Sequence, residues 1–406
     1  MRKTQISCTP FNLIRSCGIG MVMTLSIGCH LPKQSFDFPH SVSAADDLNG
    51  LFVREKGWSG GDGIFTKRVD YSRRQRKKPT GKVCWWFSDT IIREAASDSM
   101  PPGFKMIHNS MAWSNTAQID SIRFVWDTLD TEDPSLFKLP KHRYPNDQYL
   151  WLGDGFISGK KEKRLHIFQY RIWDSLQGVP FAFQEKGNGI LSFSLTGIPD
   201  PGLHTQTELP FFLGSRVSNG LSFGAAVLDN TRSIGKTKKD GFIYAYAVRG
   251  KNTQAFVARF KPEQVSDHHA WRFHTANGWT NDFTAAIPVA DSVSNEMSIT
   301  PLQDGRFLMV FMIQGIGTVI GARVGLSPTG PFGPIIPLFD VRNTLEPGKA
   351  IYAYNAKAHP ALSGKDELLI SYNVNSFDFW NDIQTYPTHY RPRFFRVNFS
   401  STNNDR

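Results

Sequence analysis

The chain has few cysteines, and most of them lie near its N-terminus. Of the four cysteines in 406 residues, Cys8, Cys17 and Cys29 fall in the first 29 residues, and only Cys84 lies beyond them. One cysteine cannot form an internal disulfide, which excludes a disulfide framework as the basis of the fold. Cys84 precedes Trp85 in an apolar string, which favours a small core residue over a catalytic thiol.

Long apolar runs and long stretches with helical periodicity are also missing. The mostly apolar run Cys17–Gly28 has 12 residues, too few to span a bilayer as a mature helix. Because basic residues precede this run, it predicts an export signal over residues 1–29. The run leads into Cys29 through a string that resembles a bacterial lipoprotein box, except that Ser26 stands where leucine is expected. We expect a periplasmic, cell-surface or extracellular protein, with lipidation at Cys29, an ordinary signal cut nearby or a retained anchor as alternatives.

The charge balance does not define a partner. The formal net charge is +10, and without the three basic residues of the leader it is 43 − 36 = +7. Such a balance permits an anionic partner. However, many basic residues fall in predicted turns, where solvated hairpin tips are the simpler interpretation. Since no nucleic-acid-binding motif accompanies them, we expect no nucleic-acid partner.

Glycine, proline and aromatic residues, in contrast, are frequent and spread along the chain, which is typical of many short strands. After residue 50 a strand–turn–strand unit recurs five times, and each second strand is rich in aromatic and β-branched residues. The predicted hairpins pair residues 63–69 with 82–89, 149–157 with 164–172, 221–228 with 242–248, 297–302 with 306–313, and 356–362 with 367–374.

The spacing of these hairpins predicts a repeat architecture. Room remains for further strands, with candidates at 121–126, 189–195, 255–260, 318–325 and a closing strand at 393–399. Four-stranded units repeated around an axis form a β-propeller. We therefore predict an all-β fold, a five-bladed β-propeller of four-stranded antiparallel blades over residues 51–399, with a β-sandwich as the alternative. Residues 30–50 are predicted as a linker and residues 400–406 as a disordered tail.

Two strings place carboxylates at one end of the first hairpin. Asp62 lies in a Gly-Gly-Asp-Gly string before its first strand, and Asp89 ends its second strand. The start of the first strand and the end of the second lie at the same end of a hairpin, so the two side chains should be neighbours. Paired carboxylates at short range are what hydrolysis of a glycosidic bond requires. The alternative for each is a turn-forming aspartate.

Two further carboxylates fall at the starts of other units. Asp154 repeats the Gly-Asp-Gly pattern, and Glu296 precedes the fourth unit. In a propeller the first strands line the axis, so these groups should converge with Asp62 and Asp89 at one opening. A crowded carboxylate cluster raises the pKa of one member and leaves its neighbour ionised. We take all four as catalytic candidates, while Asp154 has the alternative of a fold signature.

Sugar-binding candidates combine aromatic rings with amides and a histidine, because ring faces with polar rims suit sugars. Core packing is the alternative for the tryptophans, and a structural role is the alternative for the histidine. The candidates are Trp58, Asn109, Trp113, Asn355, His359 and Asn375. The remaining histidines, such as His268, His269 and His274, lack a metal-site arrangement, so we expect no metal and no cofactor, apart from an ion in the central channel, which is left open.

Several strings together resemble secreted bacterial five-bladed propellers of the uncharacterised-domain type, which are similar to furanosidase-like propeller glycosidases, including arabinan-cleaving enzymes. The resemblance covers roughly residues 51–399. It implies that carboxylates of the first blade, here Asp62 and Asp89, are catalytic. The chain departs from the pattern in its long basic first turn and in Ser88, where glycine is common. The strings are Gly57–Gly63, Phe87–Thr90, Asn109-Ser110, Ser327–Phe332 and Tyr354–Pro360.

Together these features predict an exported, monomeric, glycoside hydrolase-like protein that acts on a polysaccharide or oligosaccharide. The alternative is a non-catalytic carbohydrate-binding or scaffold propeller at the cell surface, with the membrane reached only through a lipid anchor at Cys29.

Overall fold

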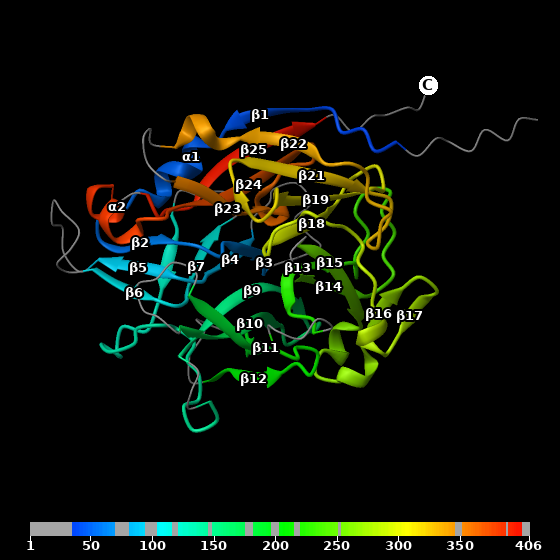
Figure 1. Cartoon of the computed structure of the whole chain (residues 1–406), viewed down its shortest axis with the longest axis horizontal. Coiled ribbons are helices and arrows are strands. Elements are labelled where there is room, and N and C mark those ends of the chain that lie inside the picture. Colours follow the sequence, from blue (N-terminus) through cyan, green and yellow to red (C-terminus); the bar gives the residue numbers. More distant parts are fainter. Residues whose placement is uncertain are drawn as a thin grey trace, which may run out of the picture. The chain divides into compact units, whose positions relative to one another are not determined.

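The structure is a computed structural model that describes residues 35–69, 81–93, 104–115, 121–144, 148–174, 182–195, 203–214, 220–250, 253–345, 351–386 and 389–399. The predicted leader at 1–29, the tip of the first hairpin at 70–80 and the predicted tail at 400–406 lie outside these residues. The described part is all-β, with several antiparallel four-stranded sheets, as predicted (Figure 1).

Within the described residues, five larger sheets and one small sheet contain the strands, and we number them I to VI. Sheet I contains β3 (Phe65–Arg68), β4 (Lys82–Phe87), β7 (Ser110–Asn115) and β8 (Arg123–Val125). Sheet II contains β9 (Tyr149–Ser158), β10 (Arg164–Asp174), β11 (Phe183–Ser194) and β12 (Thr205–Glu208). Sheet III contains β13 (Phe223–Asp229), β14 (Ile243–Arg249), β15 (Gln254–Phe260), β16 (Arg272–Thr275) and β17 (Gly278–Thr280).

Sheet IV contains β18 (Met297–Pro301), β19 (Phe307–Met312), β21 (Val319–Gly325) and β22 (Ile336–Asp340). Sheet V has the order β1 (His40–Ala44), β25 (Arg393–Phe399), β24 (Glu367–Ser376), β23 (Ile351–Ala358) and β20 (Ile316–Gly317). Sheet VI contains β2 (Gly57–Gly61), β5 (Thr90–Arg93) and β6 (Phe104–Ile107).

Helices are short and connect or flank the strands. None of those in the described ranges is long and apolar enough to cross a membrane. The α-helices are α1 (Asp46–Asn49) and α2 (Phe379–Thr385), and the 3-10 helices are η1 (Gly50–Phe52), η3 (Pro262–Gln264), η4 (His268–Ala270), η5 (Phe283–Ala285), η6 (Val341–Thr344) and η7 (Pro360–Leu362).

The five predicted hairpins are present as antiparallel pairs: β3 with β4, β9 with β10, β13 with β14, β18 with β19, and β23 with β24. The bounds predicted for the first strand of the fifth hairpin were wrong, because β23 covers residues 351–358 rather than 356–362. The strand ends before Pro360, which has no N–H for a ladder and instead begins η7. The described basic turns, 159–163 and 235–241, lie at the opposite end of their hairpins from the strand starts.

Each large sheet buries both of its faces against neighbouring sheets. In β4, Val83, Trp85 and Phe87 pack in a core shared with sheet V, and the alternate residues Cys84 and Trp86 pack in a core shared with sheet II. Further cores lie between sheets II and III, III and IV, and IV and V. Five cores therefore join the five sheets in a cyclic order, and the second strands are apolar on both faces for this reason.

Hydrogen bonds also join the first strands of successive sheets. Asp154 of β9 accepts from Lys67 of β3 and, at 2.7 Å, from the backbone N–H of Val227 in β13. Between β3 and β23, the Thr66 hydroxyl lies 2.9 Å from Nδ1 of His359, which follows β23. These first strands, β3, β9, β13, β18 and β23, lie near the middle of Figure 1. Strand starts also meet, since Tyr354 of β23 donates to Asp62, which precedes β3, and Asn355 of β23 donates to Glu296, which precedes β18.

The N-terminal part of the domain completes sheet V. All five residues of β1 pair with β25, from His40 opposite Phe399 to Ala44 opposite Phe395. The linker predicted for residues 30–50 is therefore wrong for residues 40–50, which form β1, α1 and the start of η1. The physical reason is that β25 would otherwise present an unpaired strand edge, which β1 covers.

Sheet VI continues the first hairpin on the other side of two aspartates, Asp62 and Asp89. The chain passes from β2 through Asp62 into β3, and it returns from β4 through Asp89 into β5. Beside this junction, Ser88 both donates to the carbonyl of Leu152 and accepts from its N–H. Gly63 has a φ of +58°, and a Cβ there would lie 2.7 Å from the Ser88 hydroxyl. Ser88 therefore connects the junction to sheet II.

Removal of β1 should destabilise the protein. A chain that begins at Ala45 loses a five-residue ladder on β25, and we expect its free energy of unfolding to fall by about 2 to 4 kcal/mol. Urea denaturation measures this difference. A chain that begins at Ser35 retains β1 and is the control, and equal stability of the two truncated chains would contradict the role given to β1.

Candidate active site

The two aspartates of the first hairpin are neighbours in the structure, as hairpin geometry predicts. The backbone N–H of Asp62 donates to the carbonyl of Asp89 at 3.0 Å, and the N–H of Ser88 donates to the carbonyl of Asp62 at 2.9 Å. These bonds hold the two aspartates opposite one another where sheet I meets sheet VI. The antiparallel register of β3 and β4 thus brings together residues that are 27 positions apart, from 62 to 89.

The groups around Asp62 have opposing effects on the pKa of its carboxyl. Burial raises the pKa of its carboxyl to about 8, and the negative charges of Asp89 and Glu296 contribute to the increase. Hydrogen bonds from Tyr390 and Tyr354 oppose it, and the Tyr354 hydroxyl donates to Oδ2 of Asp62 at 2.9 Å. The net result is a carboxyl that retains its proton near neutral pH.

Asp89 accepts hydrogen bonds from two rings. Trp151 Nε1 donates to Oδ1 of Asp89 at 2.8 Å, and His108 Nδ1 lies 3.0 Å from the same oxygen. The His108 ring is itself stacked on Tyr149, with centroids 3.6 Å apart and an angle of 8° between the planes. Tyr149 and Trp151 belong to β9, so sheet II orients the carboxylate of Asp89, which follows β4 of sheet I.

Glu296 reaches the same region from the start of β18. Asn355 donates to its Oε1 at 2.9 Å, and Lys357 forms an ion pair with its Oε2. The Lys357 side chain is buried, and its ammonium lies 4.2 Å from the centre of the Phe65 ring. Burial raises the pKa of Glu296, while the positive charge of Lys357 opposes that increase.

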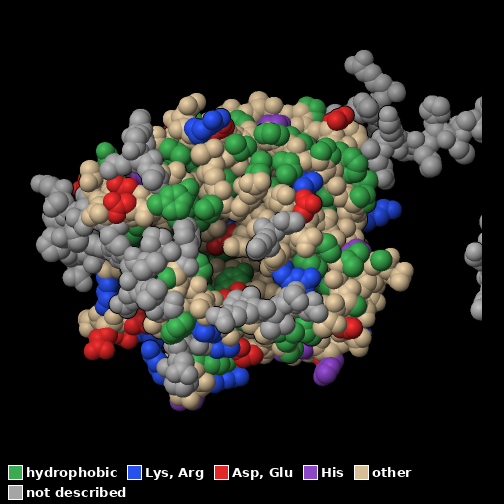
Figure 2. All heavy atoms as spheres, viewed as in Figure 1, with side chains coloured by type: hydrophobic (Ala, Val, Ile, Leu, Met, Phe, Trp, Pro, Cys, Tyr) green, Lys and Arg blue, Asp and Glu red, His purple; other side chains and the backbone are tan. Residues whose placement is uncertain are grey.

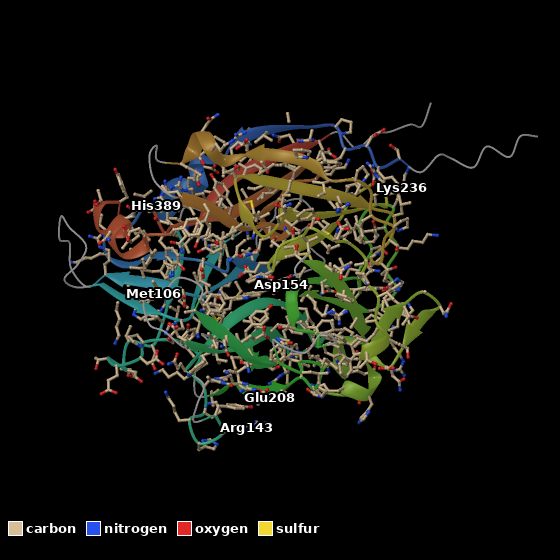
Figure 3. The ribbon with its side chains drawn as sticks, in the orientation of Figure 1. Met106, Arg143, Asp154, Glu208, Lys236 and His389 are labelled. Atoms are coloured by element: carbon tan, nitrogen blue, oxygen red, sulfur yellow. The ribbon has the colours of Figure 1, made fainter. Side chains whose placement is uncertain are left out.

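Asp154 lies deeper and is fully bonded within the protein. It is buried, near the middle of the view in Figure 3. Lys67 Nζ lies 2.9 Å from its Oδ1, and the N–H groups of Gly155 and Val227 each donate to the carboxylate at 2.7 Å. These partners come from three successive sheets. The structure thus assigns Asp154 to the connection between first strands, which is the alternative noted from its Gly-Asp-Gly pattern.

One carboxylate of this region was not predicted. Glu185 lies near the start of β11, opposite Ile172, at the same end of sheet II as Tyr149. Ser222 donates to it, and burial raises its pKa to about 7. Burial raises the pKa of the Tyr170 hydroxyl, and the negative charges of Glu185, Glu296 and Asp154 add to the increase, so these groups share one environment. The prediction missed Glu185 because it started this strand at residue 189, whereas β11 begins six residues earlier, at Phe183.

The predicted sugar-binding residues divide into buried and accessible sets. Trp58 is fully buried in the core between sheets I and V, and its indole N–H donates to Ser110. Asn109 is fully buried and bonds the backbone of Phe137 and Leu150. Both are structural, which corrects the prediction, because neither exposes an atom to a ligand.

His359 and Trp113 are also placed away from the carboxylates. His359 is buried between Thr66 and Ser371, and burial together with nearby lysines holds its pKa well below the usual range. Trp113 packs at the side of the core between sheets I and II. Among the predicted set, Asn355 contacts Glu296, and the partly exposed Asn375 lies opposite Tyr352 near the strand starts.

The surface of this end is hollowed. Figure 2 shows a depression near the centre of the view with acidic side chains inside it. In the described residues, no group of three or more His, Cys, Asp or Glu side chains has an arrangement that could hold a metal ion. The arrangement can nevertheless supply a protonated carboxyl, ionisable carboxylates and aromatic rings to one bound molecule.

The chain belongs to the family described as "Domain of unknown function (DUF5005)", whose model matches residues 45–400. A search among curated proteins found no significant match. Among solved structures, a "putative hydrolase" from Bacteroides ovatus has a TM-score of 0.67 and 21% identity, over 93% of this chain and 95% of that one. The two proteins share their fold.

Other structural neighbours are more distant. An exo-beta-1,3-galactanase from Phanerochaete chrysosporium has a TM-score of 0.44 and 9% identity, over 89% of this chain and 63% of that one. A GH43_1 enzyme from Xanthomonas citri, solved with xylose, has a TM-score of 0.41 and 9% identity, over 88% and 94% of the two chains.

Two asparagines that were both predicted to bind sugar should respond differently to substitution. Asn109→Ala leaves buried backbone groups of Phe137 and Leu150 without their partners, so we expect its free energy of unfolding to fall by about 2 to 4 kcal/mol. Asn375→Ala, at a partly exposed position, should change it by less than about 0.5 kcal/mol. Urea denaturation of both variants measures these values, and a stable Asn109→Ala protein would contradict the structural role.

The raised pKa of Asp62 should appear in the pH dependence of stability. Between the ordinary pKa of 3.8 and about 8, the folded protein holds a proton on Asp62 that the unfolded chain has lost. This contribution to stability is complete below pH 3.8, declines as the pH rises, and is lost at about pH 8. Asp62→Asn cannot ionise, so the stability of the wild type relative to this variant should fall across that window.

Thermal unfolding of both proteins at several pH values measures the effect. Asp366→Asn, in the exposed turn between β23 and β24, removes one aspartate elsewhere in the domain and is the control. A constant difference between the wild type and Asp62→Asn would show that the Asp62 pKa is not raised.

Proposed function

We propose that the protein is an exported glycoside hydrolase that acts on a polysaccharide or oligosaccharide through Asp62 and Asp89, with Glu296 beside them. The observation that carries the proposal is the junction of sheets I and VI, where two aspartates lie opposite one another and one has a pKa raised to about 8. Glycosidic-bond hydrolysis requires one protonated and one ionised carboxyl group on either side of the bond.

The proposed architecture is a five-bladed β-propeller, with sheets I to V as its blades. Its support is the cyclic order of five cores between five sheets and the contacts among the five first strands. In such a fold the first strands surround the axis, and their starts open on one face. This face carries Asp62, Asp89, Glu185 and Glu296.

In the proposed mechanism, Asp62 is the general acid. It transfers its proton to the glycosidic oxygen as the bond from that oxygen to the sugar carbon breaks. As that bond breaks, Asp89, oriented by Trp151 and His108, acts in one of two ways. As a base it takes a proton from a water molecule that bonds to the carbon. As the nucleophile it bonds to the carbon itself and forms a glycosyl ester, which a water molecule activated by Asp62 then hydrolyses. Burial of Asp62 keeps the acid protonated at neutral pH, and the charge of Asp89 increases this effect.

Other residues would support the pair. Glu296, oriented by Asn355 and Lys357, adds negative charge beside Asp62 and would stabilise positive charge on the sugar. Asp154 would act indirectly, since its bonds to Lys67 and Val227 hold the first strands in register. Asn355 and Asn375 remain proposed contacts to sugar hydroxyls.

Export is proposed from the leader sequence alone. Its basic residues, its short apolar run and Cys29 support secretion with or without a lipid anchor. A polysaccharide substrate outside the cytoplasm agrees with that location.

Hydrolysis should depend on both aspartates. We expect the wild type to release reducing ends from at least one glycan in a screen of plant, algal and bacterial cell-wall polysaccharides that includes arabinan. Asp62→Asn and Asp89→Asn should each lower the rate by at least about a hundredfold, while Asp366→Asn retains it. Activity should also fall as the pH rises through about 8, where Asp62 loses its proton.

The outcomes separate the possible functions. Equal product from the wild type and Asp62→Asn would exclude the proposed mechanism. Glycan binding without product at any pH would indicate the carbohydrate-binding alternative, and a protein that neither binds nor cleaves any glycan would indicate a scaffold.

A further inference from the structure

Two clusters of aromatic side chains lie beside the two aspartates, one on each side of sheet I. The Asp89-side cluster comprises His108, Tyr149, Trp151 and Phe183, and the Asp62-side cluster comprises Tyr352, Tyr354 and Phe377. We infer that these clusters bind sugar units on both sides of the bond that is cut, so that the substrate is a glycan chain rather than one terminal sugar on a small leaving group. This inference rests on the proposed function.

The Asp89-side cluster forms a continuous series of rings. His108 stacks on Tyr149, Tyr149 lies 5.9 Å from Trp151, and Trp151 meets Phe183 edge to face with centroids 4.6 Å apart. Its inner members, His108 and Trp151, bond Asp89, so the series begins at the carboxylate. It ends at Phe183, which is 40% exposed.

The Asp62-side cluster has a similar organisation but comes from sheet V. Tyr354 donates to Asp62 and lies 5.6 Å from Tyr352, and Tyr352 lies 4.7 Å from Phe377. This series also begins at a carboxylate and ends at an exposed ring, since Phe377 is 48% exposed. In the cyclic order of sheets, V and II are the two neighbours of sheet I, so the clusters lie on opposite sides of the carboxylate pair.

Phe183 and Phe377 each pack against the next ring of their series and still leave 40% and 48% of their surface exposed. Phenylalanine carries no group that hydrogen-bonds water, and contiguous rings that reach from a carboxylate to the solvent form an apolar surface of the kind that marks a binding site. The face of such a ring packs against the C–H groups of a sugar, while the carboxylates and amides nearby bind hydroxyl groups. Other exposed apolar side chains, such as Leu129 and Ile287, belong to neither cluster.

The test measures binding rather than turnover. Oligosaccharides of arabinan, xylan and β-1,3-galactan, as disaccharides and hexasaccharides, are titrated by calorimetry into the Asp62→Asn protein, which cannot cleave them under the proposed mechanism. We expect at least one hexasaccharide to bind more tightly than its disaccharide. Phe183→Ala and Phe377→Ala should each weaken hexasaccharide binding by about five- to tenfold, because each removes a phenyl ring from the contact.

The controls make the result specific to the clusters. Leu129→Ala removes an exposed apolar side chain elsewhere and should leave the affinity unchanged, and the two phenylalanine variants should retain the unfolding temperature of their parent. Unchanged hexasaccharide affinity in both phenylalanine variants, or no binding of any of these glycans, would overturn the inference. Measured hydrolysis with unchanged affinity would leave the proposed function in place and remove only this inference. Length-dependent binding without hydrolysis would overturn the proposed function, and the two clusters would then be binding surfaces only.

Discussion

The burial of both faces of every large sheet is the constraint on which the rest of the structure depends. A strand such as β4, with apolar residues at every position from Val83 to Phe87, is stable only between two other sheets. Five sheets meet this requirement by packing in cyclic order, and β1 pairs with β25 so that no edge of sheet V remains open at that point. The arrangement leaves the starts of the first strands as the place where polar groups from different sheets meet.

The same arrangement determines which carboxylates remain charged at the starts of the first strands. A buried carboxylate is costly unless hydrogen bonds or opposite charges compensate for its lost hydration. Asp154 has such compensation from Lys67 and two backbone N–H groups, and it therefore serves as a connector. Asp62 has hydroxyl donors, but its burial raises its pKa instead, and the two negative charges beside it add to the increase. The difference between these two aspartates separates a structural group from one suited to acid catalysis.

The positions that were predicted correctly are those that follow from hairpin geometry. Asp62 and Asp89 needed only the pairing of two adjacent strands, and the structure places their backbones in direct contact. Trp58, Asn109 and His359 were misjudged because residues near strand ends can point either into the hollow or into the cores between sheets, and the sequence pattern does not distinguish these directions. Glu185 was missed because β11 extends beyond its apolar part, and polar residues at a strand end carry no periodic signal.

The sequence by itself determined the all-β class, the five hairpins, the closing strand and the neighbourhood of the two aspartates. These features depend on local strand propensity, turn residues and the period of two, which neighbouring residues express directly. The tertiary structure alone decided that sheets II and V supply the rings around Asp89 and Asp62, that Lys357 and Asn355 orient Glu296, and that Asp154 connects three strands. These contacts join residues up to 292 positions apart, as for Tyr354 and Asp62, and they arise from the packing of complete sheets. No local pattern in the sequence encodes them.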